Sequence, residues 1–383
     1  MPKLALSTLL ASLMVALAAV PAGCALREGR GLDLPVGAIP FVVVGTGPVT
    51  AAPQTVSLGY WNPDAGTVAM DPATFFTFRA AAAGPWFGDL QLFWDGGPRV
   101  VVGSSGDPIE LTQSDPRLRF EAPAFLRGPV FPWRMLFFPS DREEWVGVRS
   151  SPYGKWVLEL YSSLEARSPN SSFSLQLPPA FGAYTPCRVA DVRYVRGQLQ
   201  LVVEAGTTAQ RIGLWLATLA QGVLEWDCLC ADLGIQEAGP GATMARVKDT
   251  VYFAEPVGPI RYLEIQSKKT GICSPATLAL DAFKAQLDSE PLWPSPPDLT
   301  AYGDTLLVQY VPGLPPGPIE GGSLSGSPQL AAYLLAVRDG EVVGEVIYQH
   351  GKLTVLSRGK AVLEVPAGGG LAPPWRFATK VGS

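Results

Sequence analysis

Few residues in this sequence have a type and spacing that could support catalysis. The 383-residue chain has one histidine, His350, which precedes Gly351 at a predicted strand junction. A Ser-His-Asp triad would have to use His350, but the sequence has no G-x-S-x-G elbow, and a histidine at a turn is typically an exposed polar residue.

Two carboxylates are enough for glycoside hydrolysis. The densest acidic pairs are Glu143 and Glu144, Glu225 and Asp227, and Asp107 and Glu110. Solvated turns explain these acids at least as well, so the catalytic residues stay unknown.

Four cysteines could form disulfide bonds: Cys187, Cys228, Cys230 and Cys273. Strict alternation along one strand places Cys228 and Cys230 on the same face, so each would need Cys187 or Cys273 as its partner. Two bridges and buried free thiols are both consistent with the sequence. A metal site is not expected, because the cysteines lack paired C-x-x-C spacing and histidine is nearly absent. No cofactor is expected either, since the glycines at 368–370 lack the helix and lysine of a phosphate loop.

The first 24 residues have the layout of an export signal. Lys3 supplies one positive charge, an apolar run covers residues 4–20, and small residues lead to Cys24. The run is too short and too weakly flanked for a stable membrane span. The end Ala22-Gly23-Cys24 resembles the lipobox of bacterial lipoproteins, with Pro21 in place of the family's usual aliphatic residue. The resemblance implies that Cys24 is lipidated and becomes the new N-terminus, which would anchor the chain to the extracytoplasmic face of a cell membrane. Cleavage after Ala22, which would release a soluble protein, is the alternative.

This signal sets the expected domain boundaries: a signal peptide at 1–23, a tether at 24–35 and one folded domain at 36–383. The formal net charge is −5 and no basic cluster stands out, so a nucleic-acid partner is not expected. The 37 prolines disfavour long helices and favour many turns and strand ends.

The region 188–230 reads as four successive strands, at 188–196, 198–204, 211–219 and 223–230. Leu199, Leu201 and Val203 alternate with their neighbours, which places them on one face of a sheet. Short connections between the strands predict an antiparallel meander.

Similar hairpins recur along the chain, and the period of the repeat predicts the architecture. One position inside the first strand of each hairpin marks the repeat, namely Leu58, Leu90, Val146, Leu199, Val251, Leu306 and Leu353. After a short first interval these markers lie 47 to 56 residues apart, which is the period of propeller repeats with four-stranded blades. We therefore expect an all-β fold, a single β-propeller of six to seven four-stranded antiparallel blades. The strand at 41–44 should close the ring in the blade that contains Leu353. Two β-sandwich domains in series are the alternative.

One turn supports this fold. The segment Ser151-Pro152-Tyr153-Gly154-Lys155-Trp156 resembles the S-P-D-G-K-x turn in the propeller repeats of TolB-like periplasmic proteins, with Tyr153 in place of the Asp. The resemblance covers a few residues and implies nothing about partners.

In a propeller, the connections between second and third strands gather at one rim. On the predicted blades these are 62–66, 95–98, 150–154, 205–210, 255–259 and 311–328. The candidate binding residues on this rim are Trp61, Asp64, Trp94, Asp95, Tyr153, Tyr310, Leu314 and Ile319. Aromatic side chains among Gly and Pro suit a protein, peptide or glycan partner. The connection 311–328 is unusually long for a compact domain, which is typical of a functional loop. The expected function is a binding or assembly module, and the alternative is an extracytoplasmic glycan hydrolase or lyase that uses carboxylates in the propeller channel.

Overall fold

The computed structural model describes residues 36–45, 54–80, 90–94, 98–102, 109–113, 119–121, 133–137, 144–150, 155–163, 166–207, 211–234, 243–254, 259–265, 273–280, 297–310, 331–349, 352–357, 360–366 and 375–380. Several predictions fall outside these ranges, namely those on Cys24, Asp95, Asp107, Glu143, Tyr153, Leu314, Ile319, His350 and the connection 311–328. Among the residues described, no helix has the length and apolarity required to cross a bilayer.

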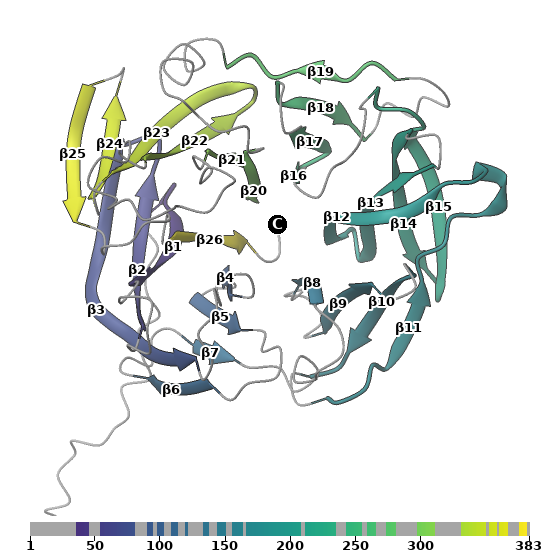
Figure 1. Ribbon diagram of the computed structural model, residues 1–383, viewed down its shortest axis with the longest axis horizontal. Helices are drawn as coiled ribbons and strands as arrows, with labels where there is room; N and C mark the ends of the chain where they lie inside the picture. Colours follow the sequence, from purple (N-terminus) through teal and green to yellow (C-terminus); the bar gives the residue numbers. More distant parts are fainter. Residues whose placement is uncertain are drawn as a thin grey trace, which may run out of the picture.

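The described strands form radial sheets around a common centre, so the fold is a β-propeller (Figure 1). Each radial group of strands is called a blade, and its strands are given from the centre outward; the eight-stranded sheet is divided into two blades between β26 and β4. Blade 1 contains β26 (Trp375–Lys380), β1 (Ile39–Gly45), β2 (Gln54–Asn62), β3 (Thr67–Ala80) and β6 (Ile109–Gln113). Blade 2 contains β4 (Leu90–Trp94), β5 (Pro98–Val102) and β7 (Arg119–Glu121). Blade 3 contains β8 (Trp133–Phe137), β9 (Trp145–Ser150), β10 (Trp156–Tyr161) and β11 (Ser171–Ser174).

The remaining three blades follow in chain order. Blade 4 contains β12 (Thr185–Val195), β13 (Gln198–Gly206), β14 (Ile212–Ala220) and β15 (Val223–Cys230). Blade 5 contains β16 (Thr243–Val247), β17 (Thr250–Ala254), β18 (Arg261–Glu264) and β19 (Ala276–Thr277). Blade 6 contains β20 (Asp298–Tyr302), β21 (Thr305–Tyr310), β22 (Ala331–Arg338), β23 (Glu341–Gln349), β24 (Lys352–Ser357) and β25 (Lys360–Pro366). A short 3-10 helix, η3 (Pro179–Phe181), precedes blade 4.

The ring closes where the two ends of the fold meet, but not in the blade that was predicted. Strand β1 pairs antiparallel with β26, Phe41 lying opposite Phe377, and with β2 on its other side. Strand β24, which contains Leu353, pairs instead with β23 and β25. The marker at Leu353 therefore belongs to an extension of blade 6, and the described strands give six blades rather than seven.

The predicted hairpins are confirmed as strand pairs, but they do not hold the same place in every blade. In blades 3 to 6 they are the second and third strands, as expected. In blade 1, β26 from the chain's C-terminal region is the innermost strand, so β2 and β3 become the third and fourth. Strand β26 also pairs in parallel with β4, the innermost strand of blade 2, which makes blades 1 and 2 one continuous sheet.

The core lies between neighbouring blades, because a middle strand buries both faces. In β14 six consecutive residues are buried, which is why its sequence reads as a nearly continuous apolar run. Leu199, Leu201 and Val203 pack toward blade 3, whereas Val202 packs toward blade 5. The two-residue periodicity of β13 thus separates two different cores.

Candidate functional site

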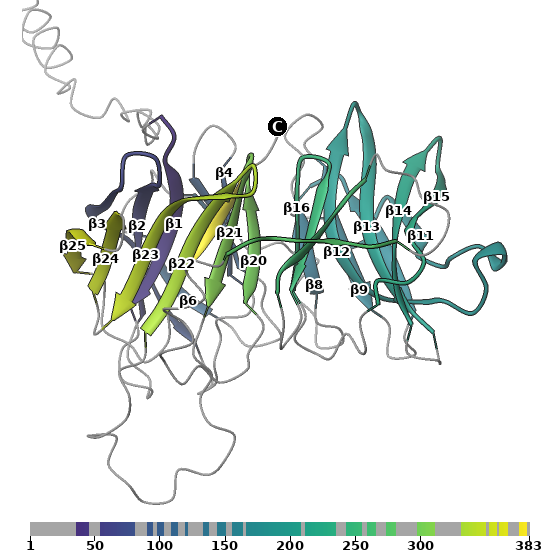
Figure 2. The same cartoon turned by 90° about the horizontal axis from the view of Figure 1, so that it is seen from above.

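The connections between strands divide into two kinds, one at each end of the ring (upper and lower edges of Figure 2). The "turn end" carries the links between first and second strands and between third and fourth strands. Three of these are two-residue turns, Arg196-Gly197, Gln221-Gly222 and Asp339-Gly340, with positive φ at both residues. Such turns match the twist of antiparallel strands. The "loop end" carries the links between second and third strands and between blades.

The predicted binding residues do not share one end. Trp61 and Asp64 flank a third-to-fourth-strand turn of blade 1, and Trp94 ends the innermost strand of blade 2, so all three lie at the turn end. Tyr310 ends β21 and leads to the loop end. The prediction of a common rim is wrong because the predicted hairpin is the third and fourth strands of blade 1 and the first and second strands of blade 2.

Trp61 is a core residue rather than an exposed aromatic. Its side chain is 1% exposed and lies against blade 6. A Cβ added at Gly344 would come within 3.1 Å of Trp61 Cζ2 and 2.6 Å of Pro63 Cβ. The absence of a side chain at Gly344 is what allows blades 6 and 1 to approach, and Trp61 cannot also stack on a ligand.

Asp64 contributes to the contact between blades 1 and 6. Arg338 Nη1 donates to both carboxylate oxygens of Asp64, at 2.8 and 2.9 Å, across a separation of 274 residues. The same guanidinium donates to Thr305 Oγ1 at 3.1 Å through Nη2. These contacts bind the β2–β3 turn of blade 1 to the turns of blade 6, because all of them lie at the turn end. The Asp64 side chain stays half exposed.

A buried charged group joins the innermost strands of blades 4 and 5, and the sequence analysis missed it. Arg193 Nε lies 2.6 Å from Asp191 Oδ2, and Arg193 Nη2 also donates to the backbone carbonyl of Arg246 at 2.6 Å. Arg246 Nη1 lies 3.9 Å from Asp191 Oδ2, and Arg246 Nη2 donates to Gln200 Oε1 at 3.2 Å. The signal in the sequence was two charges at alternating positions of a strand whose other face is apolar.

Arg246 is the most deeply placed of these charges. Its side chain is 2% exposed, and Nη1 is buried without a hydrogen-bond partner. Burial lowers the pKa of Arg246, and the Asp191 carboxylate opposes that shift. Two guanidinium groups therefore share the carboxylate of Asp191 in a nearly dry site. The carboxylate of Asp249 lies 3.7 Å from Arg246 Nη2, so two guanidinium groups face two carboxylates, and the group holds two strands together.

Cys187 and Cys228 are the free thiols among the described cysteines. Cys187 is exposed as a residue, yet its Sγ contacts the buried carboxylate of Glu204 at 3.5 Å. Desolvation, with the negative charge of Glu204, raises the pKa of Cys187 to about 12. Arg188 donates to Glu204 Oε2 at 2.8 Å and offsets part of that effect. Desolvation raises the pKa of Cys228 as well. Because a thiolate is the nucleophile, neither environment activates a cysteine.

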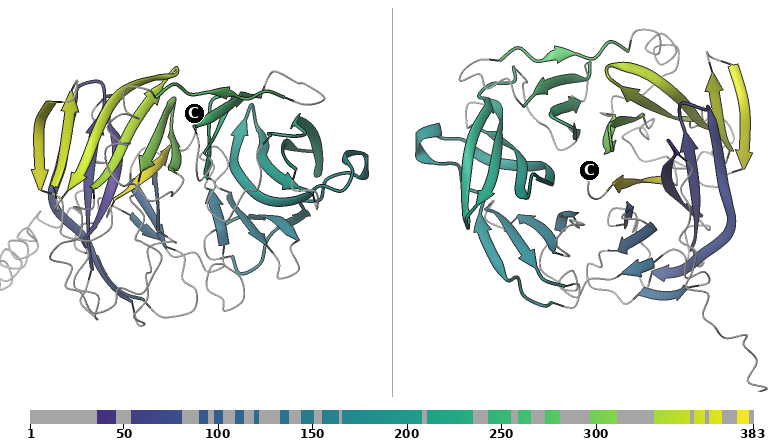
Figure 3. Two further views of the ribbon diagram at one scale, coloured as in Figure 1. Left: turned by 45° about the horizontal axis from the view of Figure 1, so that its top comes forward. Right: turned by 180° about the vertical axis from the view of Figure 1, so that it is seen from behind.

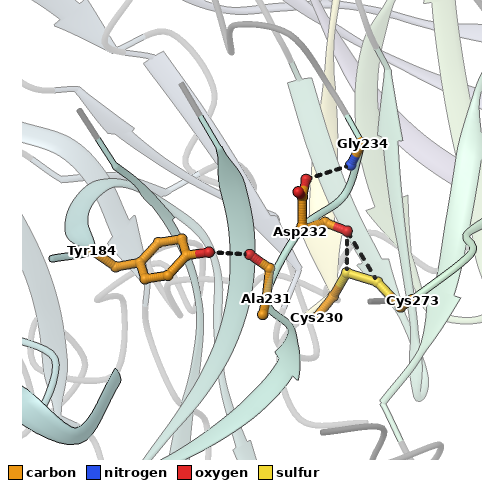
Figure 4. The surroundings of a disulfide bond; sticks show 6 residues. All are labelled: Tyr184, Cys230, Ala231, Asp232, Gly234 and Cys273. Carbon is orange, nitrogen blue, oxygen red and sulfur yellow. Dashed lines mark hydrogen bonds between the residues drawn. A yellow bond between two sulfur atoms is a disulfide. The ribbon is translucent and has the colours of Figure 1, made fainter. Parts of the chain in front are cut away.

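Cys230 and Cys273 form a disulfide between blades 4 and 5 (Figure 4). The register between β14 and β15 shifts between Leu214 and Trp215, which breaks the strict alternation that placed Cys228 and Cys230 on one face. Cys230 thereby packs among the apolar residues that face blade 5. Cys230 was expected to pair with Cys187 or Cys273, and it pairs with Cys273.

The loop around the disulfide is fixed by local hydrogen bonds. Tyr184 Oη donates to the carbonyl of Ala231 at 2.5 Å, and the backbone N–H of Gly234 donates to Asp232 Oδ1 at 2.9 Å. The carbonyl oxygen of Asp232 lies 3.2 Å from Cys230 Sγ (Figure 4). The bridge is therefore set in an ordered turn at the loop end of blade 4.

The described acids do not gather in one place. Glu225 and Asp227 are exposed on β15, the outermost strand of blade 4, as their alternation with Trp226 indicated. Glu144 accepts a hydrogen bond from Tyr194 Oη at 2.9 Å. Within the described ranges, no three His, Cys, Asp or Glu side chains are grouped as metal ligands would be.

No protein-family model matches this sequence, and no curated protein matches it. Several solved structures are similar in shape. A protein of unknown function from Dyadobacter fermentans is 12% identical, with a TM-score of 0.39, over 79% of this chain and 92% of the other. A puromycin-hydrolyzing peptidase of Mycobacterium tuberculosis is also 12% identical, with a TM-score of 0.36, over 79% of this chain and 52% of the peptidase. The computationally designed Ika8 protein is 11% identical, with a TM-score of 0.33, over 89% of this chain and 92% of the design.

Proposed function

We propose that this chain is an envelope-anchored lipoprotein whose propeller is a binding or assembly module for a protein, peptide or glycan partner. The anchor is Cys24, and the signal peptide before it directs the chain to the extracytoplasmic face of a membrane. The rest of the proposal concerns which part of the ring binds.

The observation that carries the proposal is the common direction of four connections. The links β9–β10, β13–β14, β17–β18 and β21–β22 join second and third strands in successive blades, so all leave from the loop end. One of them spans residues 311–330, whereas the β20–β21 turn of the same blade needs only residues 303 and 304. Binding residues commonly sit on loops that a rigid scaffold positions. The loop end thus has both the scaffold and the chain length for a binding surface.

The buried charges fit this assignment, because they are used inside the ring. Asp191 is engaged by Arg193, and Glu204 by Arg188. A carboxylate that is paired with an arginine inside the fold is not free to contact a bound substrate. The carboxylate-dependent hydrolase or lyase in the channel remains the alternative function, and these two acids lend it no support.

The test is a crosslinking pull-down from intact cell envelopes with the full-length tagged protein. One variant replaces 311–328 by a short Gly/Ser linker. The matched control makes the same replacement at 46–53, the link between second and third strands of the neighbouring blade 1. We expect one stoichiometric partner that is captured by the wild type and the control and lost from the 311–328 variant.

Other results would redirect the proposal. Equal capture by the 311–328 variant would remove that loop from the binding surface. If no protein is captured by any form, a glycan ligand or the enzyme alternative gains weight, and polysaccharide binding and cleavage become the next measurements. Loss of the protein from membranes in a Cys24→Ser variant checks the anchor separately.

A further inference from the structure

Both ends of the described fold lie at the turn end of the ring. The backbone carbonyl of Val36, the first residue described, accepts a hydrogen bond at 3.0 Å from Asn62 Nδ2, at the start of the β2–β3 turn. The innermost strand β26 runs parallel to β4, whose C-terminal end leads to the turn end, so Lys380 lies there too. Figure 2 shows β1 and its neighbours in blade 1, the purple strands at the left. Any anchor ahead of Val36 therefore starts from this end.

The distance from Cys24 to the fold is short compared with the height of the ring. Twelve residue positions separate Cys24 from Val36. A chain of that length spans at most about 40 Å when it is fully extended. Strand β13 has nine residues and spans about 30 Å between the two ends of the ring. Turning the loop end to the bilayer would require the tether to stretch along the side of the ring, which costs chain entropy.

The chemistry of the turn end suits a surface near lipid headgroups without insertion. Its described turns carry Arg196 and Lys248 on blades 4 and 5, and Asp304 and Asp339 on blade 6, all exposed. Charged side chains of both signs stay hydrated, so this surface can lie next to headgroups. The exposed apolar residues described at the same end are two valines, Val36 and Val223.

We propose that the turn end faces the anchoring bilayer and that the loop end points away from it. The inference rests on the proposed lipidation of Cys24. It gives the two ends separate occupants: the bilayer surface lies over the turn end, and the loop end is left open for the partner. The long connection of blade 6 then begins and ends on the side of the ring away from the membrane.

Energy transfer to lipid measures this orientation on the full, lipidated chain. The background is Cys187→Ser with Cys228→Ser, in which the thioether of Cys24 and the Cys230–Cys273 disulfide leave no free thiol. One donor fluorophore is placed at Val223→Cys, at the turn end of blade 4, and the other at Arg211→Cys, at its loop end. The two sites are matched, since Val223 is 63% exposed and the Arg211 side chain 67%. The vesicles contain phosphatidylethanolamine, phosphatidylglycerol and an acceptor-labelled lipid.

We expect several-fold stronger transfer from position 223 than from position 211, because the sites differ by most of the height of the ring. Equal or reversed transfer, with the chain still bound to vesicles, would overturn the orientation and leave the anchor standing. Absence of transfer from both sites, together with an unmodified Cys24 in the intact mass, would overturn the anchor and the orientation together.

Discussion

The two seams on either side of blade 5 are built in opposite ways. Toward blade 6, the seam is a cluster of apolar side chains that includes Val247, Leu306 and Leu335. Toward blade 4, an apolar cluster is flanked by the buried Asp191–Arg246 pair near the centre and by the Cys230–Cys273 disulfide at the outer strands. Figure 3 shows blade 5 between its two neighbours from two further directions.

A single strand supplies both kinds of seam. In β16, Ala245 and Val247 face blade 6, and Arg246 between them faces blade 4. Alternation along a strand lets neighbouring seams differ completely in chemistry. Apolar burial is nondirectional and stabilises by area, whereas an ion pair and a disulfide fix particular atoms against each other. The contacts with blade 4 therefore fix the position of blade 5, whereas apolar burial against both neighbouring blades stabilises it.

The largest expected effect comes from removing the carboxylate in the polar seam. Asp191→Ala leaves Arg246 with only the half-exposed carboxylate of Asp249, 3.7 Å from Nη2, as a counter-charge. Loss of one partner from a buried pair costs up to about 3–5 kcal/mol. We expect a large drop in the urea midpoint of unfolding. An Asp191→Ala protein as stable as wild type would mean that Asp249 or water compensates the charge of Arg246.

The matched control replaces both charges. Asp191→Leu combined with Arg246→Met fills the space with apolar atoms and leaves Arg193, which is 25% exposed, able to reach solvent. Replacing a buried ion pair by apolar residues is often nearly neutral for stability. We expect the double variant to be clearly more stable than Asp191→Ala. If the double variant instead lost as much stability as the two single substitutions together, the ion pair would contribute net stability and not only the alignment of the two strands.

The second prediction breaks the apolar seam. Leu335→Ala removes a fully buried side chain between blades 5 and 6, and the lost contacts and the cavity cost about 3 kcal/mol. Leu335→Met, which nearly conserves volume, should cost less than about 1.5 kcal/mol. The comparison is measured by the same urea titration. Equal losses of stability in Leu335→Ala and Leu335→Met would mean that the seam depends on the shape of the leucine side chain rather than on the apolar area it buries.

The third prediction concerns the covalent part of the polar seam. Cys273→Ser removes a bridge that closes a 43-residue separation, which is worth about 2–4 kcal/mol by constraining the unfolded chain. Cys228→Ser is the control, because Cys228 is a free thiol of the same blade. Thermal unfolding should show a lower Tm for the first variant than for the second. The difference should vanish when both proteins are unfolded in excess reductant.

The sequence was informative where a residue's role depends on its near neighbours. The four strands of blade 4 were predicted from two-residue periodicity and short turns, and they are present in the expected order. Periodicity fails where the backbone breaks it. The irregular register at Leu214 and Trp215 moves Cys230 to the other face of β15, and no residue type announces that shift.

Roles that depend on distant partners could not be read in this way. Trp61 looked like a rim aromatic, and its burial depends on Gly344, a residue of blade 6. The place of each strand in blade 1 depends on β26, which comes from the other end of the chain and pairs with β1. The contact between Arg246 and Asp191 was missed for the same reason, since Asp191 lies on another blade.

The smallest expected effect distinguishes the two seams by pH. Tyr252 packs against the apolar cluster between blades 5 and 6, and burial raises its pKa above the ordinary value of 10.0. A group whose pKa is raised by folding contributes its full stabilisation below the unfolded pKa and loses it as the pH rises through the folded pKa. Wild type should therefore lose stability above pH ~10 more steeply than Tyr252→Phe, which has no proton to release there. The measurement is the urea midpoint of both proteins at increasing alkaline pH. If the urea midpoints of the two proteins fell in parallel with pH, the hydroxyl of Tyr252 would reach water in the folded ring and would lie outside the apolar seam.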